Sequence, residues 1–334
     1  MSGRFSLPTN VVRQHTVPRF LLKQFAASGK GKRRRLYAFD KGSERAFATT
    51  PDDASVRNTF YDLENHPERL SLESLLGIYE NDAAPVIHAL IEHKDIRRLS
   101  EEERYRLAVF VAVQRARSFG EHQRIESLVS AVAAKLEAIG ASQEQTEQAL
   151  GLSSQQSTHN IFLAQLIEQR PHIDLLLAKD WYLYETSPGH PFYISDSPVV
   201  LYNAIDYGFY GNLGLAQKGI QIYLPISSTL TLAMLCPSIK QDFIKMKSRL
   251  EWLLAYAPWQ MPASINPFDS IEVATKYATH ELRAVTPDQL KWHNSLQVKF
   301  SEQYVFCGKG DFSLPAKMLA DNPGYKSGPR MVFG

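Results

Sequence analysis

The chain has 334 residues, of which 44% are hydrophobic and 22% charged, and this is the composition of a globular protein with a real core. Lys and Arg total 37 against 35 for Asp and Glu, giving a formal net charge of +2, which excludes a surface built throughout to hold nucleic acid. The two cysteines, Cys236 and Cys307, exclude a disulfide framework and a zinc site made mainly of thiolates.

The start of the chain does not resemble a secretory signal, because Arg4, Pro8 and Arg13 interrupt any apolar stretch. Apolar runs such as Leu107–Val113 fall far short of the roughly 20 residues that span a bilayer. We therefore expect a cytoplasmic protein with no membrane partner. The sequence does not indicate an oligomeric state.

The first sixty residues predict short elements of mixed type. Pro18 suits the first turn of a short helix that reaches Phe25, and residues 36–40 and 45–49 alternate as two strands around a turn at Lys41–Ser43. This is an N-terminal β-hairpin. A basic run precedes its first strand and contains Lys30, Lys32, Arg33, Arg34 and Arg35.

Helical spacing of apolar residues begins near Ser71, and residues 60–180 are expected to be mainly helical. Ser100 and Glu103 form a capping-box signature, after which the helical pattern continues to about Ile139. Gly120 lies within this pattern and could bend or break the helix.

The hydrophobic period switches to two at Trp181. Strands are expected over residues 181–185, 192–195, 199–202, 219–224 and 229–235, and their short connections indicate an antiparallel sheet. Helices are expected over residues 243–255, 267–280 and 287–304. The prediction is an α+β protein, mainly helical, with an N-terminal β-hairpin and a central antiparallel sheet of about four to five strands.

We expect residues 1–307 to form a single α+β domain. Its helical part covers about 60–180, its sheet about 181–236 and its C-terminal helices about 240–306. The tail over 308–334 is rich in Gly, Pro and Lys and is expected to be irregular.

Several stretches of the chain resemble one bacterial family, known as domain of unknown function 4238. The most specific stretch is a His-x-Val-Pro-Arg-x-x-Leu-x-x-Phe motif that begins at His15 and ends at Phe25. Further matching stretches are Tyr37–Lys41, Asn58–Tyr61, Ile194–Val199 and a last helical stretch, Gln303–Phe306. The resemblance covers about residues 15–306 and implies a shared fold, but it brings no activity, cofactor or catalytic residue with it.

Glu73 and Glu80 are seven residues apart and so project from one face of a helix, with Gly77 leaving that face uncluttered. They could line a groove that accepts an arginine, a metal ion or a substrate donor. The alternative is an ordinary solvated face, or salt bridges to neighbouring helices.

Gln114 and Arg117 are three residues apart within an apolar stretch, so they share one side of a helix. A buried arginine needs an anion or several acceptors. The structural partner would be Glu73 or Glu80. The functional alternative is that Arg117 binds a phosphate or carboxylate of a ligand.

His15 directly precedes the short N-terminal helix and could act as a general acid or base near neutral pH. Arg19 follows four residues later and could face the same cleft. Asp196 lies in a Ser-Asp-Ser-Pro turn and could orient His15 or hold a metal ion. Each of these residues also has a structural explanation, namely backbone hydrogen bonds and local turn chemistry.

The basic run Lys30, Lys32, Arg33, Arg34 and Arg35 is followed by Tyr37 and Phe39, a mixture that suits contacts to phosphates and bases. An ordinary exposed loop has the same composition. No P-loop, zinc helix, nucleophile elbow or dinucleotide-binding glycine pattern occurs.

Two hypotheses follow. In the first, the protein is a hydrolase of phosphodiester or other anionic substrates, such as a nuclease, with His15 as acid or base. Glu73, Glu80 and Asp196 would complete the catalytic set or bind a divalent metal ion. Substrate would be bound by Arg19, Gln114 and Arg117. In the second, a non-catalytic module binds nucleic acid or protein, and the same residues form a structural network.

Overall fold

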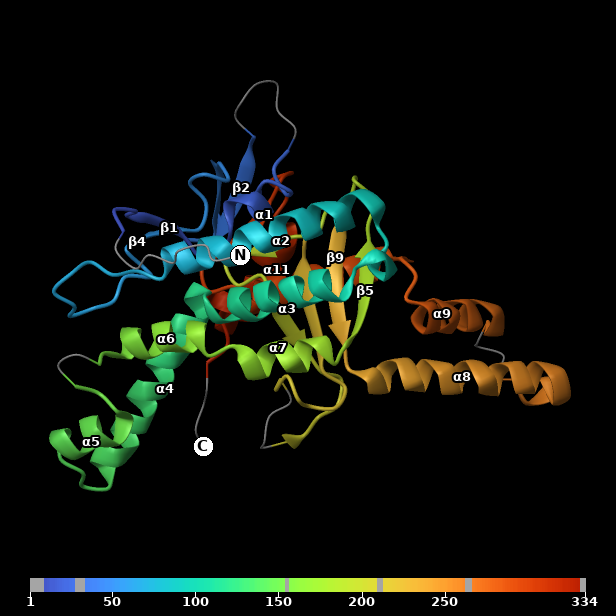
Figure 1. Cartoon of the computed structure of the whole chain (residues 1–334). Helices are drawn as coiled ribbons and strands as arrows, with labels where there is room; N and C mark the ends of the chain where they lie inside the picture. The colour runs from blue at the N-terminus through green and yellow to red at the C-terminus, as the bar shows by residue number, and fades with distance from the viewer. Residues whose placement is uncertain (1–8, 28–33, 154–155, 209–212, 262–265, 331–334) are drawn as a thin grey trace.

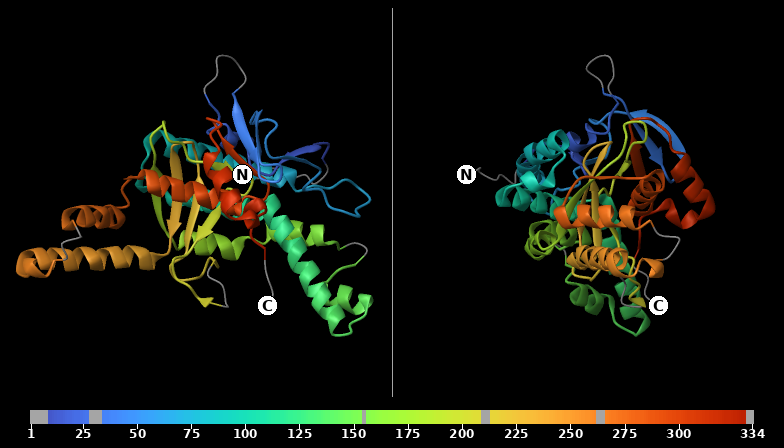
Figure 2. Two further views of the ribbon diagram at one scale, coloured as in Figure 1. Left: turned by 180° about the vertical axis from the view of Figure 1, so that it is seen from behind. Right: turned by 90° about the vertical axis from the view of Figure 1, so that its right-hand side faces the viewer.

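The computed structural model describes residues 9–27, 34–153, 156–208, 213–261 and 266–330. Its described strands form a two-stranded, a four-stranded and a five-stranded sheet, and helices pack around them (Figures 1 and 2). Within the described ranges, no helix is both long and apolar enough to cross a membrane.

The five-stranded sheet is the centre of the molecule, in the strand order β10-β5-β9-β8-β7. Its pairs are antiparallel except β10 with β5, which run parallel, so the predicted antiparallel central sheet is confirmed. Every residue of β9 is buried, as expected where helices cover both faces of a sheet. The strands are β5 (Asp180–Glu185), β7 (Val200–Tyr202), β8 (Gln221–Pro225), β9 (Leu230–Leu235) and β10 (Arg283–Ala284).

The predicted hairpin is confirmed as β2 (Leu36–Asp40) and β3 (Arg45–Thr49), which pair antiparallel. It belongs to a four-stranded sheet completed by β11 (Tyr304–Cys307) and β6 (Ile194–Ser195). The helix expected to continue to Tyr304 is wrong at its end, because Tyr304–Cys307 pairs with Tyr37–Asp40 as a strand. Residues 194–195 join this sheet rather than the central one.

The helical region contains six α-helices between residues 73 and 177 of the described chain. The long predicted helix breaks at Ser118 rather than at Gly120, since the Ser118 hydroxyl accepts the N–H of Glu121 and starts a new helix. The helices are α2 (Glu73–His93), α3 (Glu101–Ala116), α4 (Phe119–Ala138), α5 (Gln143–Leu150), α6 (Thr158–Ile167) and α7 (Arg170–Leu177).

The C-terminal helices are α8 (Pro237–Tyr256), α9 (Pro267–Thr279) and α10 (Pro287–Phe300). Figures 1 and 2 show α8 and α9 projecting together from the sheet, on the side opposite α4 and α5. The tail was expected to be irregular, but it forms α11 (Ser313–Asp321) and a short 3-10 turn, Pro323–Lys326. The physical reason is packing: Leu319 and Phe312 are buried in a cluster with Val298 and Val305.

A short strand and a short helix bring the residues of the His15 motif to the centre of the molecule. β1 (Arg13–His15) pairs antiparallel with β4 (Val56–Asn58), and α1 (Arg19–Leu22) follows directly. Leu21 and Leu22 of α1 are fully buried in the main core, together with Val17. This anchoring holds the polar residues of the same segment against α2 and α3.

Candidate functional site

A buried polar cluster surrounds Arg117, the residue that ends α3. Its side chain is 2% exposed and donates from Nη1 to Glu80 Oε1 at 2.7 Å and from Nη2 to the carbonyl oxygen of His15 at 2.5 Å. The Tyr61 hydroxyl donates to the backbone carbonyl of Arg117 at 3.0 Å. One side chain therefore ties β1 to α2 and α3, and the ion pair expected between Arg117 and a glutamate of α2 is present.

Two buried glutamine side chains extend the cluster along the N-terminal segment. Gln114 Nε2 donates to the carbonyl of Thr16 at 2.9 Å. Gln14 accepts the N–H of Tyr61 at 2.6 Å and donates to Asp62 at 2.7 Å. These bonds fix the backbone on both sides of His15, which is the precision that an acid or base requires.

Four buried side-chain atoms of this cluster have no hydrogen-bond partner in the described part of the chain: His15 Nε2, Glu73 Oε2, Gln114 Oε1 and Arg117 Nε. The described residues contain eight such atoms, so half of them lie in one cluster. Each costs about 1–3 kcal/mol if left unpaired. A concentration of unpaired groups calls for a specific explanation, and a functional site is one.

The face of α2 beside this cluster is open. A Cβ placed on Gly77 would meet no atom within 4 Å, apart from the helix's own backbone. Glu73 and Glu80 lie one turn before and one turn after Gly77 on the same face, and the Glu80 side chain is 25% exposed. The cluster therefore borders solvent at this position.

Burial shifts the pKa values of Glu73 and His15 in opposite directions. Burial raises the pKa of Glu73 to about 7, Arg117 lowers it, and Glu80 and Asp62 raise it further. Burial lowers the pKa of His15, against a hydrogen bond to the Asp52 backbone and the charge of Glu80, which raise it. Near neutral pH the cluster therefore holds a neutral His15 imidazole and a Glu73 carboxyl group that is partly protonated.

Arg19 lies outside the cluster. Its guanidinium is exposed and pairs with Asp52 at 3.1 Å, with side-chain exposures of 58% and 62%. The positive charge of Arg19 contributes to lowering the pKa of His15. The structure thus brings Arg19 near His15 but not onto the open face of α2.

Asp196 is placed elsewhere, and the expectation that it could orient His15 is wrong. Its Oδ1 accepts the N–H of Glu302 at 2.8 Å, and its Oδ2 accepts those of Gln303 and Tyr304 at 2.7 and 2.8 Å. Both carboxylate oxygens are occupied by backbone, and Asp196 is 3% exposed. Its role is to hold the corner between α10 and β11.

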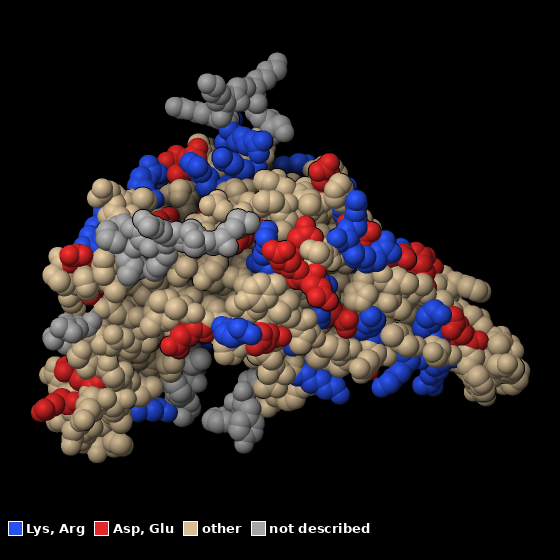
Figure 3. Space-filling model, in the orientation of Figure 1, with Lys and Arg blue, Asp and Glu red and all other residues tan. Residues whose placement is uncertain are grey.

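The basic run is described only in part, since Lys30, Lys32 and Arg33 lie outside the described residues. Arg34 Nη1 donates to the carbonyl of Lys23 at 3.1 Å, and Arg35 Nη1 donates to the Tyr37 hydroxyl at 3.4 Å. Figure 3 shows Lys and Arg side chains gathered over the β2 end of the molecule, with acidic side chains beside them.

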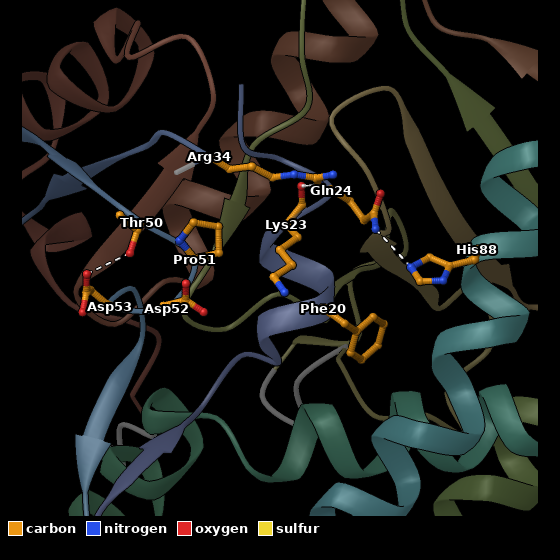
Figure 4. A pocket seen from close by; sticks show the side chains of 9 residues that line it. All are labelled: Phe20, Lys23, Gln24, Arg34, Thr50, Pro51, Asp52, Asp53 and His88. Atoms are coloured by element: carbon orange, nitrogen blue, oxygen red, sulfur yellow. Dashed lines mark hydrogen bonds between the residues drawn. The ribbon is translucent and has the colours of Figure 1, made fainter. Parts of the chain in front are cut away.

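A cavity of about 710 Å³ lies between α1, the segment 50–53 and α2 (Figure 4). Asp52 connects it to the cluster, because its backbone bonds His15 while its side chain lines the cavity. His88 lines the opposite wall and lies on the face of α2 that carries Glu80. The lining residues are Phe20, Lys23, Gln24, Arg34, Thr50, Pro51, Asp52, Asp53 and His88.

The sequence did not single out Gln14, Tyr61 or the lysine and histidine of this cavity. Gln14 precedes the His15 motif, and Tyr61 ends one of the stretches that resemble the family. Their positions beside these motifs were the only sign in the sequence that they belong to the site. Lys23 and His88 gave none, because single residues on helix faces are common. No three His, Cys, Asp or Glu side chains of the described residues come together so as to hold a metal ion.

Comparison with known proteins supports the sequence resemblance. The family model described as Protein of unknown function (DUF4238) matches residues 13–311. Neither the curated proteins nor the solved structures give a match. The matched range contains every residue of the Arg117 cluster and of the neighbouring cavity. The chain therefore belongs to the DUF4238 family, a family of proteins of unknown function.

Proposed function

We propose that the protein is a hydrolase of phosphodiester or other anionic substrates, acting at the open face of α2 between Glu73 and Glu80. The observation that carries this proposal is the gathering of unpartnered buried atoms around Arg117, among them His15 Nε2 and Glu73 Oε2. A structural network would pair these atoms with each other, whereas a site leaves them for a ligand.

The chemistry uses the two groups in opposite roles. Neutral His15 takes a proton from a water molecule as the water oxygen bonds to phosphorus. The phosphorus–oxygen bond to the leaving group breaks, and the protonated carboxyl of Glu73 gives its proton to the leaving oxygen. Solvent then returns the proton from His15 to Glu73. An environment that raises the pKa of the Glu73 carboxyl and lowers the pKa of the His15 imidazole suits this division into acid and base.

Arg117 supplies positive charge where negative charge develops on the phosphoryl oxygens. Glu80 holds the guanidinium in place through the 2.7 Å ion pair. His15 and Glu73 are half-buried residues whose unpartnered atoms turn inward. The proposed reaction requires a change of side-chain rotamer that brings those atoms to the open face beside Gly77, and catalytic contacts commonly tighten only with substrate bound.

A non-catalytic binding module is the second candidate, and one observation favours it. Arg117 joins β1, α2 and α3 through bonds that would stabilise any protein. In this case Arg117 and Glu80 serve the fold, and nucleic acid binds along the basic side chains near Arg34. The two candidates differ in whether His15 is needed for turnover.

The experiment compares wild-type protein with His15→Asn on DNA, RNA and bis(p-nitrophenyl) phosphate, with Mg²⁺, with Mn²⁺ and with a chelator. We expect turnover that falls by about 100-fold or more in His15→Asn. His190→Asn, in an exposed turn far along the chain, is the matched control and should keep the wild-type rate. Binding of DNA or RNA without turnover under every condition would favour the non-catalytic module.

A further inference from the structure

In the cavity beside α1 the carboxylates have ionic partners among the described residues, whereas the cations do not. Its two carboxylates are already paired, Asp52 with Arg19 at 3.1 Å and Asp53 with Arg13 at 2.8 Å. Its two cations, Lys23 and Arg34, form no ion pair with any carboxylate of the described residues. Lys23 and Arg34 are therefore the charges of the lining that remain available to an anionic ligand, because Arg13 and Arg19 neutralise its two carboxylates.

The arrangement of the cations suits a phosphate group. In Figure 4, Lys23 reaches between Asp52 and Phe20, and Arg34 lies across the top of the cavity. The Arg34 guanidinium is held by the backbone carbonyl of Lys23 at 3.1 Å, and both residues line the cavity. A planar guanidinium and an ammonium on one cavity are the donors that phosphate oxygens accept most readily.

An aromatic wall stands beside the cations. Phe20 is half-buried and meets the ring of His88 edge-on, with ring centroids 6.4 Å apart. Gln24 holds that imidazole through a contact of 3.1 Å to its Nε2. Positive groups next to an aromatic surface are typical of sites for single-stranded nucleic acid, where phosphates meet cations and bases meet rings.

The cavity and the Arg117 cluster lie along the same side of α2. Residues 73, 77, 80, 84 and 88 follow helical spacing on one face, and Glu80 marks the cluster while His88 marks the cavity. Eight residues of helix separate these two, a distance of about 12 Å. Position 84 is an alanine, so no large side chain of α2 stands between them.

From this juxtaposition we propose that Lys23 and Arg34 bind a second phosphate of the substrate, and that the substrate is a single-stranded oligonucleotide lying along α2. The phosphodiester at Glu73 and Glu80 is the one cleaved, which rests on the proposed function. The phosphate in the cavity is held without reaction and sets the register of the strand. A mononucleotide can occupy only one of the two phosphate-binding positions and therefore binds weakly.

The test measures binding without turnover, in a His15→Asn background, by fluorescence anisotropy of a labelled short single-stranded DNA. Lys23→Gln combined with Arg34→Gln is expected to weaken binding about tenfold or more and to flatten its salt dependence. Arg35→Gln is the matched control, because Arg35 belongs to the same basic run but bonds Tyr37 and does not line the cavity. It should bind as the background protein does.

Unchanged affinity in the double variant would overturn the assignment of the cavity, and equal affinity for a mononucleotide would overturn the extended substrate. If no substrate is hydrolysed but oligonucleotide binding still depends on Lys23 and Arg34, the hydrolase proposal fails while the cavity assignment stands.

Discussion

Arg117 is the residue on which the polar cluster depends, because its guanidinium holds both Glu80 and the backbone of His15. Replacing it by Met removes one partner of a buried ion pair and leaves the other uncompensated. We expect Arg117→Met to lower the free energy of unfolding in urea by about 3 kcal/mol. Arg106→Met breaks an exposed pair with Glu102 and should change stability by less than about 0.5 kcal/mol. Equal effects of the two changes would refute the structural part of this role.

Burial of the Glu73 carboxyl group should lower the stability of the fold at high pH, and the proposed catalytic role explains why this residue is present. Its folded pKa of about 7 lies above the ordinary value of 4.5, so its contribution to stability is full below pH 4.5 and is lost as the pH rises through 7. Glu73→Gln removes this loss, and after allowance for partial exposure we expect it to stabilise the protein by about 2 kcal/mol at alkaline pH.

Urea unfolding of wild type and Glu73→Gln on both sides of pH 7 measures this difference. The two proteins should converge in stability below pH 4.5, where the Glu73 carboxyl of the wild-type protein is protonated in both the folded and the unfolded chain. A constant difference across the whole range would show that the pKa of Glu73 is not raised by folding.

At the scale of elements, α2 combines structural and functional demands. Gly77 lies within the helix at a position where a Cβ would meet open space, although alanine is the better helix former. We expect Gly77→Ala to raise the free energy of unfolding by about 0.5–1 kcal/mol. The added methyl group covers the open face, so turnover should fall in the same variant. A variant that is more stable and fully active would show that the face is not used.

Most helices and strands could be predicted from the sequence because their signals are local. The capping box at Ser100 marks the start of α3, and the alternation after Trp181 marks the central sheet. β11 was misassigned because its strand character comes from pairing with Leu36–Asp40, some 260 residues earlier. The tail helix α11 was missed for a similar reason, since its stability comes from packing onto the four-stranded sheet.

The candidate site was predictable to the extent that spacing along a helix reveals a face. The spacing predicts that Glu73 with Glu80, and Gln114 with Arg117, each share one side of a helix. In the structure Arg117 and Gln114 bond the backbone carbonyls of His15 and Thr16, and Glu80 pairs with Arg117. The sequence could not show that the Asp196 carboxylate accepts hydrogen bonds from three backbone N–H groups of a segment far along the chain. Nor could it show the cavity, whose walls come from three separate segments.

At the scale of the whole molecule, acid should destabilise the fold through a buried histidine. His293 of α10 is 7% exposed among aromatic rings, and burial lowers its pKa to about 4, with Arg283 acting in the same direction. The unfolded chain therefore binds more protons between pH 6.5 and about 4, and stability is lost as the pH falls through that window.

The loss attributable to His293 amounts to about 3 kcal/mol at most, from the size of the pKa change. Unfolding free energies measured in steps from pH 7 to pH 4 give the slope, and His293→Gln should reduce it. An unchanged slope would mean that His293 is not the group responsible. Burial also lowers the pKa of His122, whose Nε2 lies 3.1 Å from His159, so a smaller slope should remain in the variant.

The proposed hydrolase activity depends on whether the unpartnered groups around Arg117 perform acid–base chemistry. The most direct measurement is the initial rate of phosphodiester hydrolysis by wild type and by Glu73→Gln, near neutral pH, with folding of both verified by urea unfolding. We predict a loss of about 100-fold or more in Glu73→Gln, although that variant is the more stable protein above pH 7. A wild-type rate in Glu73→Gln would contradict the assignment of the site.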